Sequence, residues 1–167
     1  MIARRHQKGE AASEALYSGC ETYRYALTRI WAEGPRLLYI MLNPSTATEV
    51  QNDPTIERCE RRARALGFGG FRATNIFALR QTDPFEMRRH AAPEGPENDA
   101  VLRAGLDWAD MVLAAWGTHG AHRGRGPQVE ALLRQGGRPV HHLGLSKAGH
   151  PKHPLYIAYA QAPERWF

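Results

Sequence analysis

Three short polar stretches contain the side chains best suited to chemistry. Asn43 follows directly on an apolar run, Asn75 lies within a second predicted strand, and His150 and His153 lie in the stretch from Gly149 to Tyr156. A carboxamide at the tip of a buried strand can hold a water molecule or accept a substrate N–H in a dry cleft. An asparagine offers one acceptor and two donors, which matches the edge of a pyrimidine or an amide. An imidazole can stabilise the negative charge that develops on a leaving group.

Each of these stretches also has a purely structural explanation. An asparagine beside a proline, as in Asn43-Pro44, commonly fixes a tight turn. Asn75 must be fully hydrogen-bonded if it lies inside a buried strand. The two histidines have metal-ligand spacing, but prolines prevent a regular helix between them and no acidic residue or cysteine lies nearby. The sequence therefore predicts no metal site and no cofactor, and it leaves open whether His150 or His153 acts.

Cations cluster beside these stretches. Arg123 and Arg125 lie in a glycine-rich segment, and Lys152 precedes His153. Such side chains can contact phosphates, although a solvated loop is the simpler interpretation. The glycine-rich segment lacks the Lys-Ser/Thr ending of a phosphate-binding P-loop, so the sequence does not indicate nucleotide hydrolysis.

The elements that must position these residues alternate between strands and helices. Residues 36–42 are continuously apolar and predict a buried parallel strand. Asp53-Pro54 predicts a helix start, with Asp53 as the N-cap. The remaining predictions are strands over residues 23–31, at a sheet edge, and over 71–77, 111–116 and 138–143, and helices over 54–67, 98–109 and 127–135.

This alternation predicts an α/β fold with a mainly parallel central sheet in a three-layer α/β/α sandwich. The polar turns would then meet at the carboxyl ends of the strands, where open α/β sheets bind ligands. Residues 1–20 are polar and weakly patterned, so we expect an N-terminal arm followed by one domain over residues 21–167.

Length and composition limit the function classes. The 167 residues, 43% hydrophobic and 23% charged, are typical of a globular domain and exclude a disordered or fibrous chain. No apolar run approaches the roughly 20 residues of a membrane span, and no secretory signal is present, so we expect a cytoplasmic monomer. Cys20 and Cys59 are too few for a zinc or iron–sulfur site and predict two reduced thiols. The net charge of +5 fits an anionic partner without requiring one.

Motifs along most of the chain resemble those of the bacterial DUF1643 family. The resemblance runs from Tyr23 to Tyr156. The motifs that carry it are Met41-Leu42-Asn43-Pro44-Ser45-Thr46, Asn52-Asp53-Pro54-Thr55, Thr74-Asn75-Ile76-Phe77, Trp116-Gly117 and His153-Pro154-Leu155-Tyr156. The family name supplies no activity.

A more distant resemblance is to the uracil-DNA glycosylase superfamily. Ile40-Met41-Leu42-Asn43-Pro44-Ser45 is similar to its first motif, and residues 74–77 and 150–155 are similar to two others. The resemblance implies that Asn43 positions the attacking water, that Asn75 reads a flipped base and that His150 or His153 stabilises the leaving base. Pro44 and Ser45 would line the base site, and Phe77 or Tyr156 would stack on the base.

The chain departs from the superfamily at several positions. Glycines of the first motif are replaced by Met41 or Leu42 and by Ser45, and the four cysteines of the iron–sulfur branch are absent. The sequence hypothesis is therefore a DNA glycosylase-like hydrolase that cleaves the N-glycosidic bond of a damaged or modified base. The partner would be DNA, with Arg123, Arg125 and Lys152 on the flanking phosphates. The alternatives are a hydrolase of free modified nucleosides or nucleotides and a non-catalytic nucleic-acid or nucleotide-binding module.

Overall fold

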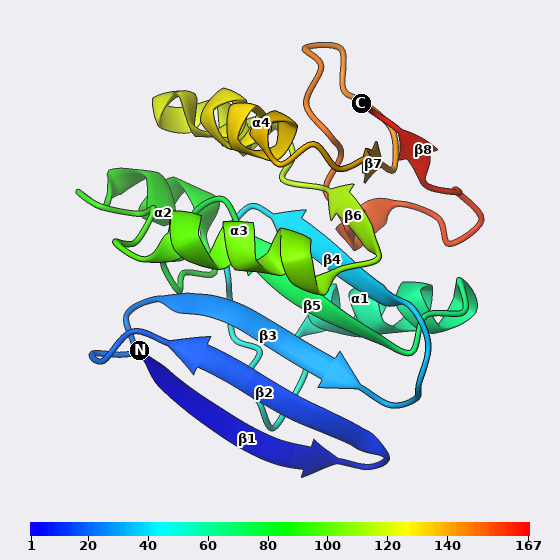
Figure 1. The fold of residues 1–167 in the computed structure, drawn as a ribbon. Helices are drawn as coiled ribbons and strands as arrows, with labels where there is room; N and C mark the ends of the chain where they lie inside the picture. The colour runs from blue at the N-terminus through cyan, green and yellow to red at the C-terminus, as the bar shows by residue number, and fades with distance from the viewer.

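The computed structural model describes all residues from 1 to 167 and contains one eight-stranded sheet with helices against both of its faces (Figure 1). The strands are β1 (Ile2–Lys8), β2 (Ala11–Tyr17), β3 (Arg24–Ile30), β4 (Arg36–Met41), β5 (Gly70–Asn75), β6 (Met111–Ala114), β7 (Val140–His142) and β8 (Glu164–Arg165). The helices are α1 (Pro54–Ala65), α2 (Pro84–Arg89), α3 (Asn98–Trp108) and α4 (Arg125–Gln135), with 3₁₀ segments η1 (Thr118–Gly124) and η2 (Pro154–Tyr156).

The sheet has a parallel centre and antiparallel flanks. Its order is β1-β2-β3-β5-β4-β6-β7-β8, and only the pairs β5–β4, β4–β6 and β6–β7 are parallel. The other four pairs are antiparallel. The prediction of a mainly parallel sheet is therefore wrong for the sheet as a whole. The parallel strands nevertheless end at one edge, where the turns after β4, β5 and β6 come together.

The first twenty residues form a hairpin and not an arm. β1 pairs with β2 along its whole length, and β2 pairs with β3. Every residue of β1 is at least partly exposed, so this edge strand carries none of the alternating apolar signal that would have predicted it. β3, predicted at a sheet edge, instead lies between β2 and β5.

Alternate side chains of β4 build two cores. Leu38 and Ile40 pack with α3 and α4 on one face, while Tyr39 and Met41 pack with α1 on the other. The predicted start of α1 is confirmed: the Asp53 side chain caps the helix by accepting from the Ile56 N–H at 2.9 Å. None of the helices combines the length and apolar character that crossing a bilayer requires.

Candidate functional site

A cleft of about 530 Å³ opens at the carboxyl ends of the parallel strands. Asn43 and Ser45 line it from the turn after β4, and Trp116 to Thr118 line it from the turn after β6. The first residues of α1, the segment from Gln81 to Pro84 that follows β5, and three residues around η2 also line it: His153, Leu155 and Tyr156. This volume lies within the range of small-molecule sites in proteins.

A small polar chamber lies behind the cleft. Its volume is about 30 Å³, enough for about two water molecules. Five residues line both spaces, so the chamber and the cleft are continuous: Asn43, Ser45, Asp53, Thr55 and His153. Arg24 and Asn75 line the chamber but not the cleft. Asn43, Asn75 and His153, which lie far apart in the sequence, therefore meet at one place.

Hydrogen bonds to backbone carbonyl oxygens fix the orientation of the Asn43 side chain. Its Nδ2 donates to the carbonyl oxygens of Gln81 at 2.6 Å and of Leu79 at 3.4 Å. Both contacts come from the segment that follows β5, so the loop orients the carboxamide before any ligand arrives. The Oδ1 atom has no protein donor, so Asn43 supplies a fixed acceptor at the cleft.

Two buried donors of the chamber lack a protein partner. Asn75 is 2% exposed, and its Nδ2 makes no hydrogen bond. Arg24 is 1% exposed; its Nη1 donates to the carbonyl of Ala47 at 2.7 Å, while its Nε is unpartnered. An unsatisfied buried donor costs free energy of about 1–3 kcal/mol, so both groups favour an acceptor in the chamber.

Arg24 stays charged despite its burial. Burial lowers the pKa of its guanidinium to about 10, while the negative charge of Asp53 opposes that change. The side chain is therefore a cation at neutral pH. The sequence interpretation missed this residue, although an arginine between Tyr23 and Tyr25 in a predicted strand was the available signal.

His153 is a neutral hydrogen-bond donor. Its Nδ1 accepts from the Leu155 N–H at 3.3 Å and caps η2, so the proton of the neutral ring resides on Nε2. Burial lowers the pKa of His153 to about 4, and the nearby Asp53 charge opposes this only in part. The ring is uncharged at neutral pH and presents an N–H.

Of the two candidate histidines, the structure places only His153 in the cleft. The backbone N–H of His150 donates to Ser146 Oγ at 3.1 Å, within a turn that an isolated bridge between Leu145 and Pro151 closes. His150 lines neither the cleft nor the chamber.

Two arginines of α1 hold the segment that carries His153. Arg58 Nη2 donates to the Ile157 carbonyl at 2.6 Å, and Arg62 Nη2 donates to the same oxygen at 2.9 Å. On the other side, the Gly117 N–H donates to the Pro151 carbonyl at 2.7 Å. Gly117 adopts a φ of +73°, which only glycine tolerates easily, and a Cβ there would lie 3.5 Å from His153 Cβ.

The other predicted base-site residues separate into two groups. Pro44 and Ser45 line the chamber, and Tyr156 lines the cleft with 91% of its surface exposed. Phe77 is fully buried in the core beneath, where its ring lies 5.8 Å from that of His122. Tyr156 is therefore available to stack on a ligand, whereas Phe77 is not.

The cations predicted to contact phosphates do not line the cleft. Arg125 is 3% exposed; it donates to the Ile76 carbonyl at 2.7 Å and pairs with Asp99 at 2.6 Å. This burial is incompatible with a phosphate contact, so the interpretation of Arg125 is corrected to a structural one. Arg123 pairs with Glu94 at 2.7 Å, and Lys152 is exposed outside the cleft.

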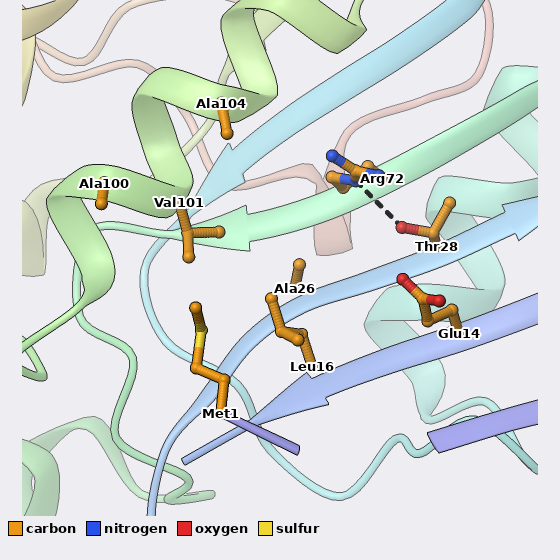
Figure 2. A pocket seen from close by; sticks show the side chains of 9 residues that line it. All are labelled: Met1, Glu14, Leu16, Ala26, Thr28, Arg72, Ala100, Val101 and Ala104. Carbon is orange, nitrogen blue, oxygen red and sulfur yellow. Dashed lines mark hydrogen bonds between the residues drawn. The ribbon is translucent and has the colours of Figure 1, made fainter. Parts of the chain in front are cut away.

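A second hollow, of about 220 Å³, lies between the N-terminal strands and α3 (Figure 2). β2, β3, β5 and α3 form its walls, and Figure 2 shows the short side chains of Ala100, Val101 and Ala104 facing Leu16 and Ala26. None of the predicted site residues lines it. No group of three or more His, Cys, Asp or Glu side chains is arranged to hold a metal ion.

Comparison with known proteins gives one match. The family model described as "Protein of unknown function (DUF1643)" matches residues 24–155, which include the chamber and nearly all of the cleft. No curated protein and no solved structure matches the chain.

Proposed function

The chain belongs to the DUF1643 family, and from the geometry of its cleft we propose that it is a glycosylase-like hydrolase. It cleaves the N-glycosidic bond of a damaged or modified nucleobase. The observation that carries this proposal is the polar chamber, where unpartnered donors of Asn75 and Arg24 meet a fixed Asn43 acceptor and a neutral His153. The motif resemblance to the uracil-DNA glycosylase superfamily supports the same assignment.

Asn43 holds the attacking water. The chamber has room for about two water molecules, and the fixed Oδ1 accepts a hydrogen bond from one of them. Orientation of a nucleophile in this way removes much of the entropic cost of the reaction. The negative charge of Asp53, which borders the same space, stabilises the positive charge that develops on the sugar.

The leaving base departs with the electrons of the broken bond. Its negative charge meets the Nε2–H of His153 in the cleft, while one carbonyl oxygen of the base reaches the Nδ2 of Asn75 and the Arg24 cation in the chamber. Such preorganised donors stabilise a transition state in which charge develops next to them. A bond forms between the water oxygen and the anomeric carbon as the bond to the base nitrogen breaks. The water proton ends on the released base, and the sugar keeps a hydroxyl group.

The donors also set a preference among bases. Asn75 and Arg24 require acceptors, which the carbonyl oxygens of uracil, hypoxanthine and xanthine provide. The amino groups of cytosine and adenine would place donors against donors. A substrate that leaves a buried donor of the site unpaired is strongly disfavoured relative to one that pairs with it.

One observation favours a second candidate, a hydrolase of free modified nucleosides or nucleotides. Arg123, Arg125 and Lys152 lie outside the cleft, so the predicted basic rim is not at the cleft mouth. A free nucleoside would not need that rim, and it would use the same water and the same donors.

The test presents both substrate classes to the purified protein. Single-stranded and duplex oligonucleotides carry uracil, hypoxanthine, xanthine or an alkylated base, and the matching free nucleosides are run in parallel. Abasic sites are scored by alkaline strand cleavage, and free bases are identified by mass spectrometry. Release from oligonucleotides supports the first candidate, and release from nucleosides alone supports the second. No release by protein with a native circular-dichroism spectrum would contradict both.

A further inference from the structure

A groove between α2 and η1 joins the main cleft. Its volume is about 310 Å³, and Phe85, Arg88, Thr118, His119, Ala121 and His122 line it. Thr118 and His119 also line the main cleft. A ligand that fills the cleft therefore lies next to the groove.

An exposed aromatic ring forms one side of this groove. Phe85 is 59% exposed, although large apolar side chains of this fold are mostly buried in its cores. The His119 ring meets it edge to face at a centroid distance of 5.1 Å, and the Arg88 guanidinium lies 5.9 Å from its centre. An open aromatic face with a cation beside it is the arrangement on which single-stranded bases stack.

The groove also contains an unpaired cation. Arg88 makes no ion pair, whereas Arg89 pairs with Glu86 at 2.8 Å and Arg123 pairs with Glu94 at 2.7 Å. Burial lowers the pKa of His122, and the positive charges of Arg88 and Arg123 lower it further, while the negative charge of Glu94 opposes them. Arg88 is thus the free cation of the groove and is suited to a phosphate.

We propose that this groove binds the nucleotide next to the one in the cleft, so that the substrate is a single strand of DNA. The base of that neighbour stacks on Phe85, and its phosphate lies near Arg88. Tyr156 lines the cleft from η2 and supplies a second exposed ring for the strand. This inference rests on the proposed N-glycosidic hydrolysis for the identity of the cleft ligand. The nucleic-acid contacts are then made by Phe85 and Arg88 in place of Arg123, Arg125 and Lys152.

Binding of a single strand that contains no cleavable base tests the groove by itself. The probe is a fluorescein-labelled thymidine 12-mer, and the readout is fluorescence anisotropy at low salt. Phe85→Ala weakens binding about tenfold, because one stacking contact is lost. Arg88→Glu weakens it by a similar factor that shrinks as salt increases.

Arg89→Glu is the matched control for Arg88→Glu. Both arginines are exposed residues of the same short helix and both substitutions change the charge equally, but only Arg88 lines the groove. Affinity within about twofold of wild type in Arg89→Glu supports the proposal. Equal weakening by the two substitutions would show a general charge effect and overturn it, as would unchanged affinity in Phe85→Ala.

A turnover ratio separates this proposal from the proposed function. In Phe85→Ala, release of a base from a strand relative to release from the free nucleoside falls about tenfold, and Arg89→Glu leaves the ratio unchanged. An unchanged ratio in Phe85→Ala would overturn the groove while leaving glycosidic hydrolysis in place. If no substrate releases a base, the hydrolysis proposal fails, and the anisotropy series still decides whether the groove binds a strand.

Discussion

Two hollows of this fold, the apolar one beside the N-terminal hairpin and the polar chamber, differ in both size and chemistry, and the smaller one has the reactive groups. The hollow beside the N-terminal hairpin is lined mostly by apolar side chains (Figure 2). Its polar residues have partners: Arg72 Nε donates to Thr28 Oγ1 at 3.0 Å, and Glu14 accepts from Arg5 Nε at 2.8 Å. The chamber at the carboxyl ends of β4 and β5 is far smaller, yet it contains the unpartnered donors of Asn75 and Arg24. The convergence of two unsatisfied donors on one cavity, and not the volume of that cavity, identifies the candidate site.

The direction of the strands explains this difference. β4, β5 and β6 are parallel, so their polar turns meet at one edge and surround a shared space. β1, β2 and β3 are antiparallel, so consecutive strand ends lie on opposite edges. The hairpin flank therefore offers a surface without a convergent set of polar groups.

Removal of the Asn43 carboxamide should have the largest effect. Asn43→Ala removes the acceptor that orients the water, so base release falls about 10³-fold. The same variant also loses the hydrogen bonds from Asn43 to the backbone of the segment after β5, so its free energy of unfolding should fall by about 1 kcal/mol. Initial rates of base release measure the first effect, and urea denaturation measures the second.

Thr28→Val is the control variant in the apolar hollow for the effect of Asn43→Ala on base release. Thr28 lines the apolar hollow, so this variant should release base at the wild-type rate. A rate loss in Thr28→Val equal to that of Asn43→Ala would mean that the two hollows are not functionally distinct.

The structure also separates Arg125 from Arg123. Arg125→Ala removes a buried cation that donates to the Ile76 carbonyl and pairs with the Asp99 carboxylate, and it should lower the free energy of unfolding by about 3 kcal/mol. Arg123→Ala breaks an exposed ion pair and should cost less than about 1 kcal/mol. Guanidinium denaturation of the two variants measures the difference, and equal losses would contradict the burial of Arg125.

The neutral state of His153 predicts a dependence of stability on pH. In the unfolded chain the imidazole takes up a proton as the pH falls below about 6.5, whereas the folded pKa is about 4. The unfolded state therefore binds more protons in this window, and stability falls with the pH. Between pH 7 and 5 the loss from His153 is about 2 kcal/mol.

His153→Asn isolates that contribution. Asparagine keeps an acceptor for the cap on η2 but does not titrate. The difference in unfolding free energy between wild type and variant should therefore change between pH 7 and 5 and then level off near pH 4. A constant difference over this range would show that His153 is not buried in its neutral form.

The smallest effect is expected in the apolar hollow. Ala104→Leu adds apolar surface to a space that the protein leaves open, so stability should rise by no more than about 1 kcal/mol. Base release should not change. Thermal unfolding and the base-release assay together check this, and a loss of activity would connect the hollow to the site.

Sequence patterns within a few residues predicted the elements that such short patterns determine, namely an apolar strand and a capped helix start. The apolar run of β4 and the Asp53-Pro54 cap of α1 were predicted from sequence and are present. The hairpin was missed because β1 is exposed on both faces and buries no apolar stripe. The six-residue α2 is too short for a helical period to be recognised.

The site was only partly predictable for a related reason. Asn43, Asn75 and His153 follow strand ends or a turn, which local sequence shows. The burial of Arg24 and Arg125 depends on partners 23 and 49 residues away, Ala47 and Ile76. Local sequence cannot distinguish such a buried cation from a solvated one, so Arg125 was assigned to the surface and Arg24 was overlooked.

The most direct test of the central claim is the identity of the released product. Wild-type protein is incubated with one single strand that carries uracil, hypoxanthine or xanthine at a single position, and with matched strands that carry cytosine or adenine there. Mass spectrometry should detect a free carbonyl-bearing base and an abasic site in equal amounts, with the cytosine and adenine strands intact. No free base from any strand or nucleoside, with native folding verified, would contradict the account.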